Sequence, residues 1–193
     1  MANYYAISDS TWELLEPALR LRHLQKHECL YQSGSHPASF SFVFQGLMRL
    51  FTSDASGAEY NKNFFAENSF VGCMTALLTG EPSRYSVTAV EDCVLVEINH
   101  AAFRRILMTQ ADLMQYQIAY LEKNWLLHKD ARELEIVQQD ARTRYLRFIE
   151  QFPHLSERLP QYLIASHLGI TPTQLSRVRK TLGEGHWPET TPK

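Results

Sequence analysis

Hydrogen-bonding and basic side chains are concentrated near the C-terminal end of the sequence, from Pro172 to Leu182. The apolar residues of this segment have the spacing of one helix face and are Leu175, Val178 and Leu182. The other side chains of the segment therefore face outward. The outward side chains are of the types that bind base edges and phosphate oxygens. We expect the first turns of this helix to enter the major groove, so that bases are contacted by Thr173, Gln174 and Arg177. Nearer to phosphates we place Thr171, Ser176, Arg179 and Lys180.

A second short helix precedes this segment. Pro160 suits a helix start, because its missing N–H group is harmless in the first turn. The helix ends at Gly169, a residue type that favours the left-handed turn after a helix, and its apolar face consists of Leu163, Ile164 and Leu168. Thr171 can then cap the next helix. Residues 159–182 therefore predict a helix-turn-helix; the alternative is a helical hairpin that only packs against the rest of the protein.

The charge distribution supports a nucleic-acid interface in the last quarter of the chain. The 193 residues carry a formal net charge of −2, which alone would argue against nucleic-acid binding. Residues 139–182 hold seven basic and three acidic side chains, a net charge of +4, so the rest of the chain carries −6. No acidic residue lies between Arg158 and Gly183. A basic end on an acidic body is the arrangement that attracts phosphate groups.

The first half of the chain must form the body that carries this segment. Residues 9–21 predict a short helix, with Asp9 or Ser10 as its N-cap. Between Cys29 and Ile98 the sequence contains short β-rich runs separated by turn signals. Strands at this spacing indicate an antiparallel barrel or jelly roll.

A long helical region, or a series of helices, follows from Asn99, which can serve as its N-cap. Every seventh residue is apolar or aromatic, the spacing of a coiled-coil seam: Ile106, Leu113, Tyr120, Leu127 and Leu134. The companion positions are mostly polar: Gln110, Gln117, Asn124 and Ala131. We favour a dimerisation helix; the alternative is that this stripe packs on the strand domain.

The order of these parts resembles the Crp/Fnr family of transcription regulators. The turns with Gly34, Gly46, Gly57 and Gly72 are similar to the glycine positions of that family's β-roll, and the segment RYLRFIEQFPHLSERLPQYLIASHLGITPTQLSRVRKTL is similar to its DNA-binding end. The resemblance implies an α+β fold, with a sensor β-roll (a double-stranded β-helix or jelly roll) over residues 1–108, a long dimerisation helix over 109–138 and a helix-turn-helix over 139–193. It also implies a homodimer that reads a near-palindromic sequence of double-stranded DNA.

The sequence departs from the family at the positions that hold cyclic AMP. Members that bind this ligand carry Gly-Glu and Arg-Ser pairs, whereas Gly72 is followed here by Cys73, and Arg84 comes one place late behind Ser83. A thiol cannot replace the carboxylate that accepts the ribose hydroxyl. We therefore expect an effector other than cyclic AMP, if any, in a pocket formed by Phe70, Val71, Gly72, Arg84, Tyr85, Ser86, Lys123 and Asn124.

Other classes of function lack support in the sequence. The three cysteines and eight histidines form no zinc or redox motif, and the chain has no phosphate-binding loop or nucleophile elbow, so we expect no enzyme, metal or cofactor. The cysteine cluster that holds an iron–sulfur centre in oxygen-sensing members is missing as well. No apolar run is long enough to cross a bilayer and no signal peptide is evident, so we expect a cytoplasmic protein with RNA polymerase as a candidate partner. A ligand-binding or protein-interaction module whose helix-turn-helix does not bind DNA is the alternative function.

Overall fold

The computed structural model describes residues 4–126 and 140–183. Contacts divide them into two compact units. The first contains residues 4–52 and 63–126, and the second contains residues 53–62 and 140–183. No helix in these described ranges is both long enough and apolar enough to span a membrane.

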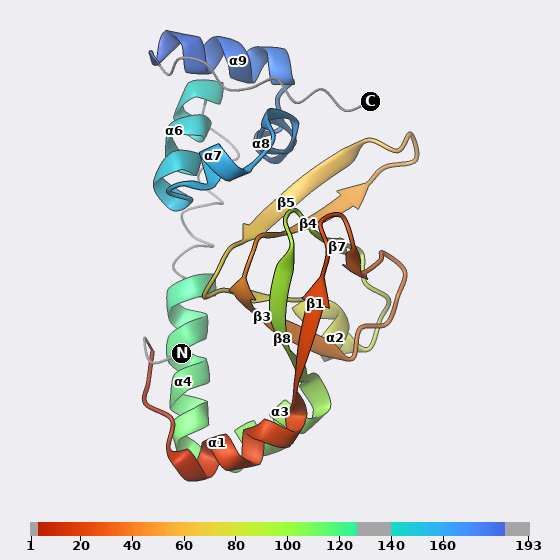
Figure 1. The fold of residues 1–193 in the computed structure, drawn as a ribbon, viewed down its shortest axis with the longest axis vertical. Helices are drawn as coiled ribbons and strands as arrows, with labels where there is room; N and C mark the ends of the chain where they lie inside the picture. Colours follow the sequence, from red (N-terminus) through yellow and green to blue (C-terminus); the bar gives the residue numbers. More distant parts are fainter. Residues whose placement is uncertain (1–3, 127–139, 184–193) are drawn as a thin grey trace. The chain divides into compact units, whose positions relative to one another are not determined.

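The strands form two four-stranded antiparallel sheets, which belong to the first unit except at the ends of β4 and β5 that lie within residues 53–62 (Figure 1). One sheet has the order β1-β8-β3-β6, with strands Leu19–Leu24, Cys93–Asn99, Ser39–Gln45 and Phe70–Val71. The other has the order β2-β7-β4-β5, with strands Cys29–Tyr31, Ser86–Ala89, Met48–Ser53 and Glu59–Phe65. The expected α+β class with an antiparallel jelly roll is confirmed.

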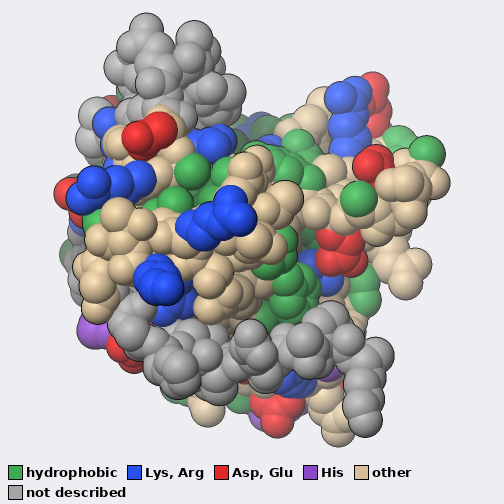
Figure 2. Space-filling model, turned by 90° about the horizontal axis from the view of Figure 1, so that it is seen from above, with side chains coloured by type: hydrophobic (Ala, Val, Ile, Leu, Met, Phe, Trp, Pro, Cys, Tyr) green, Lys and Arg blue, Asp and Glu red, His purple; other side chains and the backbone are tan. Residues whose placement is uncertain are grey.

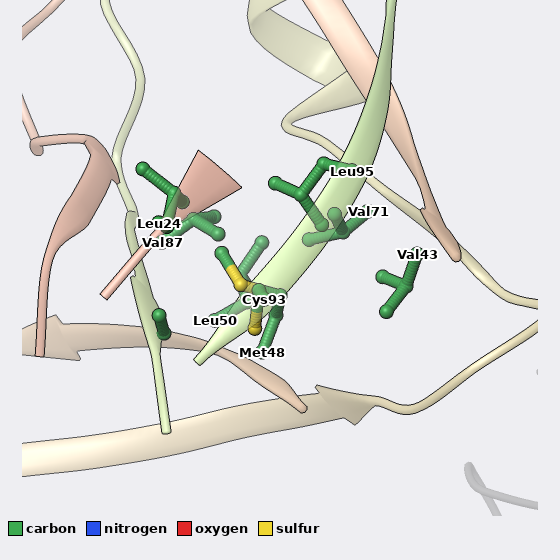
Figure 3. Packing of buried hydrophobic residues seen from close by; sticks show 9 residues of the cluster. Leu24, Val43, Met48, Leu50, Val71, Val87, Cys93 and Leu95 are labelled. Atoms are coloured by element: carbon green, nitrogen blue, oxygen red, sulfur yellow. The ribbon is translucent and has the colours of Figure 1, made fainter. Parts of the chain in front are cut away.

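Both sheets contribute side chains to one hydrophobic core (Figure 3). The strand β8 shows the alternation that produces this core, because Cys93 and Leu95 are buried while Val94 and Val96, on the opposite face, are half-buried. The core cluster consists of Leu24, Val43, Met48, Leu50, Val71, Val87, Ala89, Cys93 and Leu95. Burial raises the pKa of the Cys93 thiol, so this side chain behaves as a small apolar group.

The N-terminal helix is shorter than the sequence predicts. Helix α1 (Asp9–Leu15) and a 3-10 turn (Glu16–Ala18) are followed directly by β1, and the N-cap is Ser8 rather than Asp9 or Ser10. The backbone N–H and the hydroxyl of Ser8 both donate to Asp112. These bonds hold the pKa of the Asp112 carboxyl low, at about 2. The prediction failed because residues 19–21 belong to a strand that pairs with β8 along its whole length.

Three helical elements follow β8: α3 (His100–Leu107), α4 (Ala111–Leu121) and a π-helical turn, η2 (Glu122–Leu126). Asn99 caps α3 through a bond from the Ala102 N–H, as the sequence predicts. A second core cluster joins this region to α1 and consists of Leu15, Leu107 and Leu113, with Ile7, Trp12, Phe103 and Ile106 packed against it.

The orientation of α4 corrects the expected dimer seam. Leu113 is only 1% exposed and Ile106 packs in the same cluster, so both side chains are used inside the monomer. Tyr120 is half-buried against Phe70, while Leu127 and Leu134 lie outside the described residues. A different set of apolar side chains is exposed, at spacings of four, three and four residues: Met114, Ile118, Leu121 and Trp125. This spacing is that of coiled-coil a and d positions. Met114, Ile118 and Leu121 lie on the side of the helix opposite to Tyr116 and Tyr120, whereas the Trp125 side chain forms a hydrogen bond with Tyr120.

Gly46 joins β3 to β4 in a place that only glycine fits. Its φ of +98° is left-handed, and an added Cβ would lie 2.5 Å from the Asp92 carbonyl oxygen and 2.7 Å from Cys93 Sγ. Gly57 has a similar φ of +84° but nothing within 4 Å of an added Cβ.

We predict that Gly46→Ala lowers the free energy of unfolding by about 3 kcal/mol or more, since it adds a steric clash to backbone strain. Gly57→Ala, the matched control, adds strain alone and should cost about 1 kcal/mol. Urea denaturation of both variants measures the difference. Equal losses would show that the packing around Gly46 is not as described.

Candidate nucleic-acid interface

The second unit is a small helical domain. Its helices are α6 (Ala141–Gln151), α7 (Leu155–Arg158), α8 (Gln161–Leu168) and α9 (Pro172–Thr181). Asp140 caps α6 by accepting a bond from the Thr143 N–H at 2.8 Å, which lowers the pKa of the Asp140 carboxyl. The buried side chains that hold the helices together include Tyr145, Phe148, Leu159, Ile164, Ala165 and Leu175.

The turn between α8 and α9 has the features that the sequence predicts. Gly169 ends α8 with a left-handed conformation, φ +65°. Thr171 caps α9: its hydroxyl accepts a bond from the Gln174 N–H, and the Gln174 side-chain oxygen accepts one from the Thr171 N–H at 2.9 Å. This reciprocal capping box fixes the first turn of α9.

One face of α9 is exposed and free of acidic groups. Thr173, Arg177 and Lys180 follow one another at spacings of four and three residues, so they form a line along that face, and Ser176 lies beside it. Figure 2 shows Lys and Arg side chains beside hydrophobic and other side chains on the face that is seen from above. Gln174 is exposed too, but its oxygen is engaged in the capping box.

Arg179 corrects the expected phosphate contacts. Its side chain is only 8% exposed and lies four residues after Leu175, on the buried face of the helix. Arg179 therefore belongs to the interior of the helical domain and not to its exposed face. The exposed residues of the expected set are Thr171, Thr173, Gln174, Ser176, Arg177 and Lys180.

Residues 53–62, at the tip of the β4–β5 hairpin, cluster with this helical unit. The Ser166 hydroxyl donates to the Glu59 carbonyl at 2.6 Å and accepts from the Asn61 N–H at 3.1 Å. The His167 ring nitrogen Nδ1 lies 3.0 Å from the Asn61 carbonyl oxygen. Sequence reasoning missed these contacts, because no local pattern connects residues more than one hundred positions apart.

The residues of the expected effector pocket separate into two groups. Three of them contact an aromatic cluster formed by Tyr4 and Tyr120. Phe70 packs on Tyr120, Asn124 bonds to the Tyr4 hydroxyl, and Lys123 lies over the Tyr4 ring. The others have different contacts: Val71, which follows Phe70 in β6, is in the core, Gly72 packs against Phe40, Tyr85 covers the core, Ser86 bonds to the Ser33 N–H, and Arg84 is exposed.

The positions that hold a cyclic phosphate in the resembling family are occupied differently here. Cys73 is buried, and the Ser83 hydroxyl is used inside its own turn, where it donates to the Tyr85 carbonyl and accepts from the Tyr85 N–H. Arg84 points to solvent. No carboxylate or buried cation therefore stands at these three positions to bind a ribose or a phosphate.

The described residues also line a cavity of about 280 Å³ at another place in the β-roll. It is bordered by Leu30, Tyr31, Ser35, His36, Pro37, Ala38, Ser39 and Glu97, none of which belongs to the expected pocket. Burial raises the pKa of the Tyr31 hydroxyl, so this group is a neutral hydrogen-bond donor. The described ranges contain no group of three histidine, cysteine or acidic side chains that could hold a metal ion.

Comparison with known proteins identifies the architecture. Residues 21–110 match the family model of the cyclic nucleotide-binding domain. The chain is similar in structure to the c-di-GMP responsive global regulator CLP of Xanthomonas campestris, with 17% identity, a TM-score of 0.71 and coverage of 91% of this chain and 92% of that one. It has the fold of the Crp/Fnr regulators.

Two further structures share this Crp/Fnr fold. FixK2 from Bradyrhizobium japonicum is 16% identical, with a TM-score of 0.73 over 86% of this chain and 84% of that one. The catabolite activator protein of Thermus thermophilus is 19% identical, with a TM-score of 0.57 over 96% and 90%. No curated protein sequence matches the chain significantly. At these identities the likeness establishes the fold, and the site must be argued from its own residues.

The two arginines of α9 give a matched test of this Crp/Fnr-type helical domain. We predict that Arg179→Ala lowers the free energy of unfolding of the domain by about 2 kcal/mol, because a buried and partnered side chain is removed. Arg177→Ala removes an exposed side chain of the same type and should change it by less than about 0.5 kcal/mol. Urea unfolding of both variants measures the two values. Similar losses, or a larger loss for Arg177→Ala, would contradict the orientation of α9.

Proposed function

We propose that the chain is a DNA-binding transcription regulator of the Crp/Fnr type, in which α9 is the recognition helix. The observation that carries this proposal is the exposed line of Thr173, Arg177 and Lys180, which has no acidic neighbour on α8 or α9. Arginine can make a bidentate contact with guanine in the major groove, and lysine binds phosphate as a point charge. The exposed face of α9 has no interior role in the described helical domain, whereas Leu175 and Arg179 on its other face are buried.

The residues that read bases are, on this account, Thr173 and Arg177. Gln174 can contact a base through its amide N–H groups while its side-chain oxygen stays in the capping box. If DNA takes the place of Thr171 as the donor to this oxygen, both ends of the amide can contact a base. Lys180, Ser176 and Thr171 bind the phosphate backbone. Exposed Arg142 and Arg147 of α6 add positive charge to the same domain.

The chain acts as a homodimer in this proposal, through the exposed stripe of Met114, Ile118, Leu121 and Trp125. Two copies related by a two-fold axis would cover these side chains and present two recognition helices. The DNA site is then near-palindromic, with half-sites about one helical turn, or roughly 34 Å, apart. A cytoplasmic regulator of this type has RNA polymerase as a candidate partner and no enzymatic role.

Cyclic AMP is not the effector in this proposal. Cyclic AMP would lose its bonds to water on binding, and it would need a carboxylate for its ribose and a buried cation for its phosphate in their place. Neither group is present at the positions of Cys73, Ser83 and Arg84. A family match to the cyclic nucleotide-binding domain describes how residues 21–110 fold. Which small molecule binds depends on the side chains at each position.

The test is selection of duplexes from a random-sequence DNA library by the purified protein, followed by fluorescence anisotropy on the selected duplex. We predict an inverted repeat with half-sites about 10 base pairs apart, and an affinity that falls steeply with salt. Arg177→Ala should weaken binding at least about 10-fold. Arg20→Ala, which removes the same charge from exposed β1, should bind within about twofold of the wild type.

Two outcomes would refute this function. Absence of duplex binding at about 50 mM salt would leave a module whose helix-turn-helix only packs. Equal binding by Arg177→Ala and the wild type would remove α9 from the interface.

A further inference from the structure

Tyr4 lies in a socket of aromatic side chains on α4. Its ring makes edge-to-face contacts with Tyr116 and Tyr120, each with ring centroids 5.4 Å apart. Lys123 Nζ lies 5.5 Å from the centroid of the Tyr4 ring, and Phe70 of β6 packs edge-on against Tyr120 at 5.3 Å. Figure 1 shows the N-terminal segment running beside α4. All of these residues belong to the first compact unit.

The socket recognises the hydroxyl of its occupant as well as the ring. Asn124 Nδ2 donates to the Tyr4 hydroxyl at 2.9 Å and to the Tyr120 carbonyl at 2.9 Å, so both amide protons are used. Asn124 lies in the π-helical turn η2, a kind of irregularity that is frequent at functional sites. The bond to Tyr4 therefore connects the occupant of the socket to the backbone of this turn.

A second hydroxyl in the socket has no partner. Tyr116 is 4% exposed, and its hydroxyl has no hydrogen bond among the described residues. Burial is the main cause that raises the pKa of Tyr116, and the nearby Tyr4 and Tyr120 hydroxyls raise it further. A buried hydroxyl without a partner is costly, so it marks a place where a ligand oxygen would gain a bond that Tyr4 does not supply.

We propose that this socket is a binding site for a small para-substituted phenol, for which Tyr4 is the resident occupant. A phenol has the ring that packs edge-on against Tyr116 and Tyr120 and the oxygen that accepts from Asn124. A ligand that replaces Tyr4 can also place its oxygen within reach of the Tyr116 hydroxyl. The ligand competes with the N-terminal segment and leaves the cavity beside Tyr31 unaffected.

The position of the socket gives binding a consequence. Tyr116 and Tyr120 lie on one side of α4, and the exposed residues Ile118 and Leu121 lie on the opposite side. When Tyr4 leaves the socket, the turn η2 loses the hydrogen bond between Asn124 and the Tyr4 hydroxyl. The same turn carries the exposed Trp125. Occupancy of the socket is thereby connected to Trp125, the exposed apolar residue at the end of the stripe.

The experiment is rescue of a socket emptied by Tyr4→Ala, with p-cresol as the probe. The variant should melt about 5 °C or more below the wild type, since it loses an aromatic cluster. Millimolar p-cresol should restore at least half of that shift in a saturable manner. Toluene, which has the same shape without the hydroxyl, should restore less than half as much as p-cresol does. Tyr5→Ala is the control, because Tyr5 is exposed and adjacent.

The Tyr116 hydroxyl is tested in the same titration. Adding Tyr116→Phe to Tyr4→Ala should reduce the preference for p-cresol over toluene. If Tyr4→Ala does not fold, Tyr4→Leu keeps an apolar cover without the hydroxyl, and the same titration is decisive on it. The proposal is overturned if p-cresol shifts the melting of the Tyr4 variant no more than that of Tyr5→Ala. DNA takes no part in this measurement, so its result is independent of the proposed function.

Discussion

Helix α4 has two apolar faces that must both be covered from water, and the arrangement of the surrounding elements depends on this constraint. Its inner face, with Leu113, Tyr116 and Tyr120, is covered by α1, α3, β6 and the N-terminal segment. Its outer face exposes Ile118 at 50% and Leu121 at 42%. A helix that is apolar on both sides is stable in water only when both sides are covered. The monomer covers one of them.

The inner face ties separate parts of the chain to α4. Asp112 receives bonds from the Ser8 backbone and side chain and from Thr11, and Asn124 bonds to Tyr4. These contacts bring residues near the N-terminus onto a helix that lies more than one hundred positions later. The orientation of the outer face is therefore fixed by contacts inside the first unit.

Local signals predicted the helix-turn-helix because each of its boundaries is determined by neighbouring residues. Gly169, Thr171 and Gln174 form a turn and a capping box that depend on no distant contact. Arg179 was misplaced because residue type alone suggested a phosphate contact, whereas its spacing from Leu175 puts it on the buried face.

The assignments that failed elsewhere required tertiary information. In α4, apolar residues one position apart, such as Leu113 and Met114, belong to opposite environments, and a spacing of seven residues does not reveal which is inside. Residues 19–21 continue a helical pattern, yet they pair with β8. The socket around Tyr4 gave no sequence signal, because its members come from the N-terminus, β6 and α4.

The central claim is that the exposed stripe of α4 joins two copies of the chain, and cysteine cross-linking at Ile118 tests it most directly. A parallel two-fold seam places identical residues side by side, so Ile118→Cys should form a disulfide-linked dimer under mild oxidation. The wild type controls for the native cysteines, and Leu78→Cys controls for an exposed apolar site outside the stripe. We expect rapid cross-linking of Ile118→Cys and of neither control. We also expect the wild-type protein to sediment as a dimer. A monomeric wild type, or equal cross-linking of Leu78→Cys, would contradict the account.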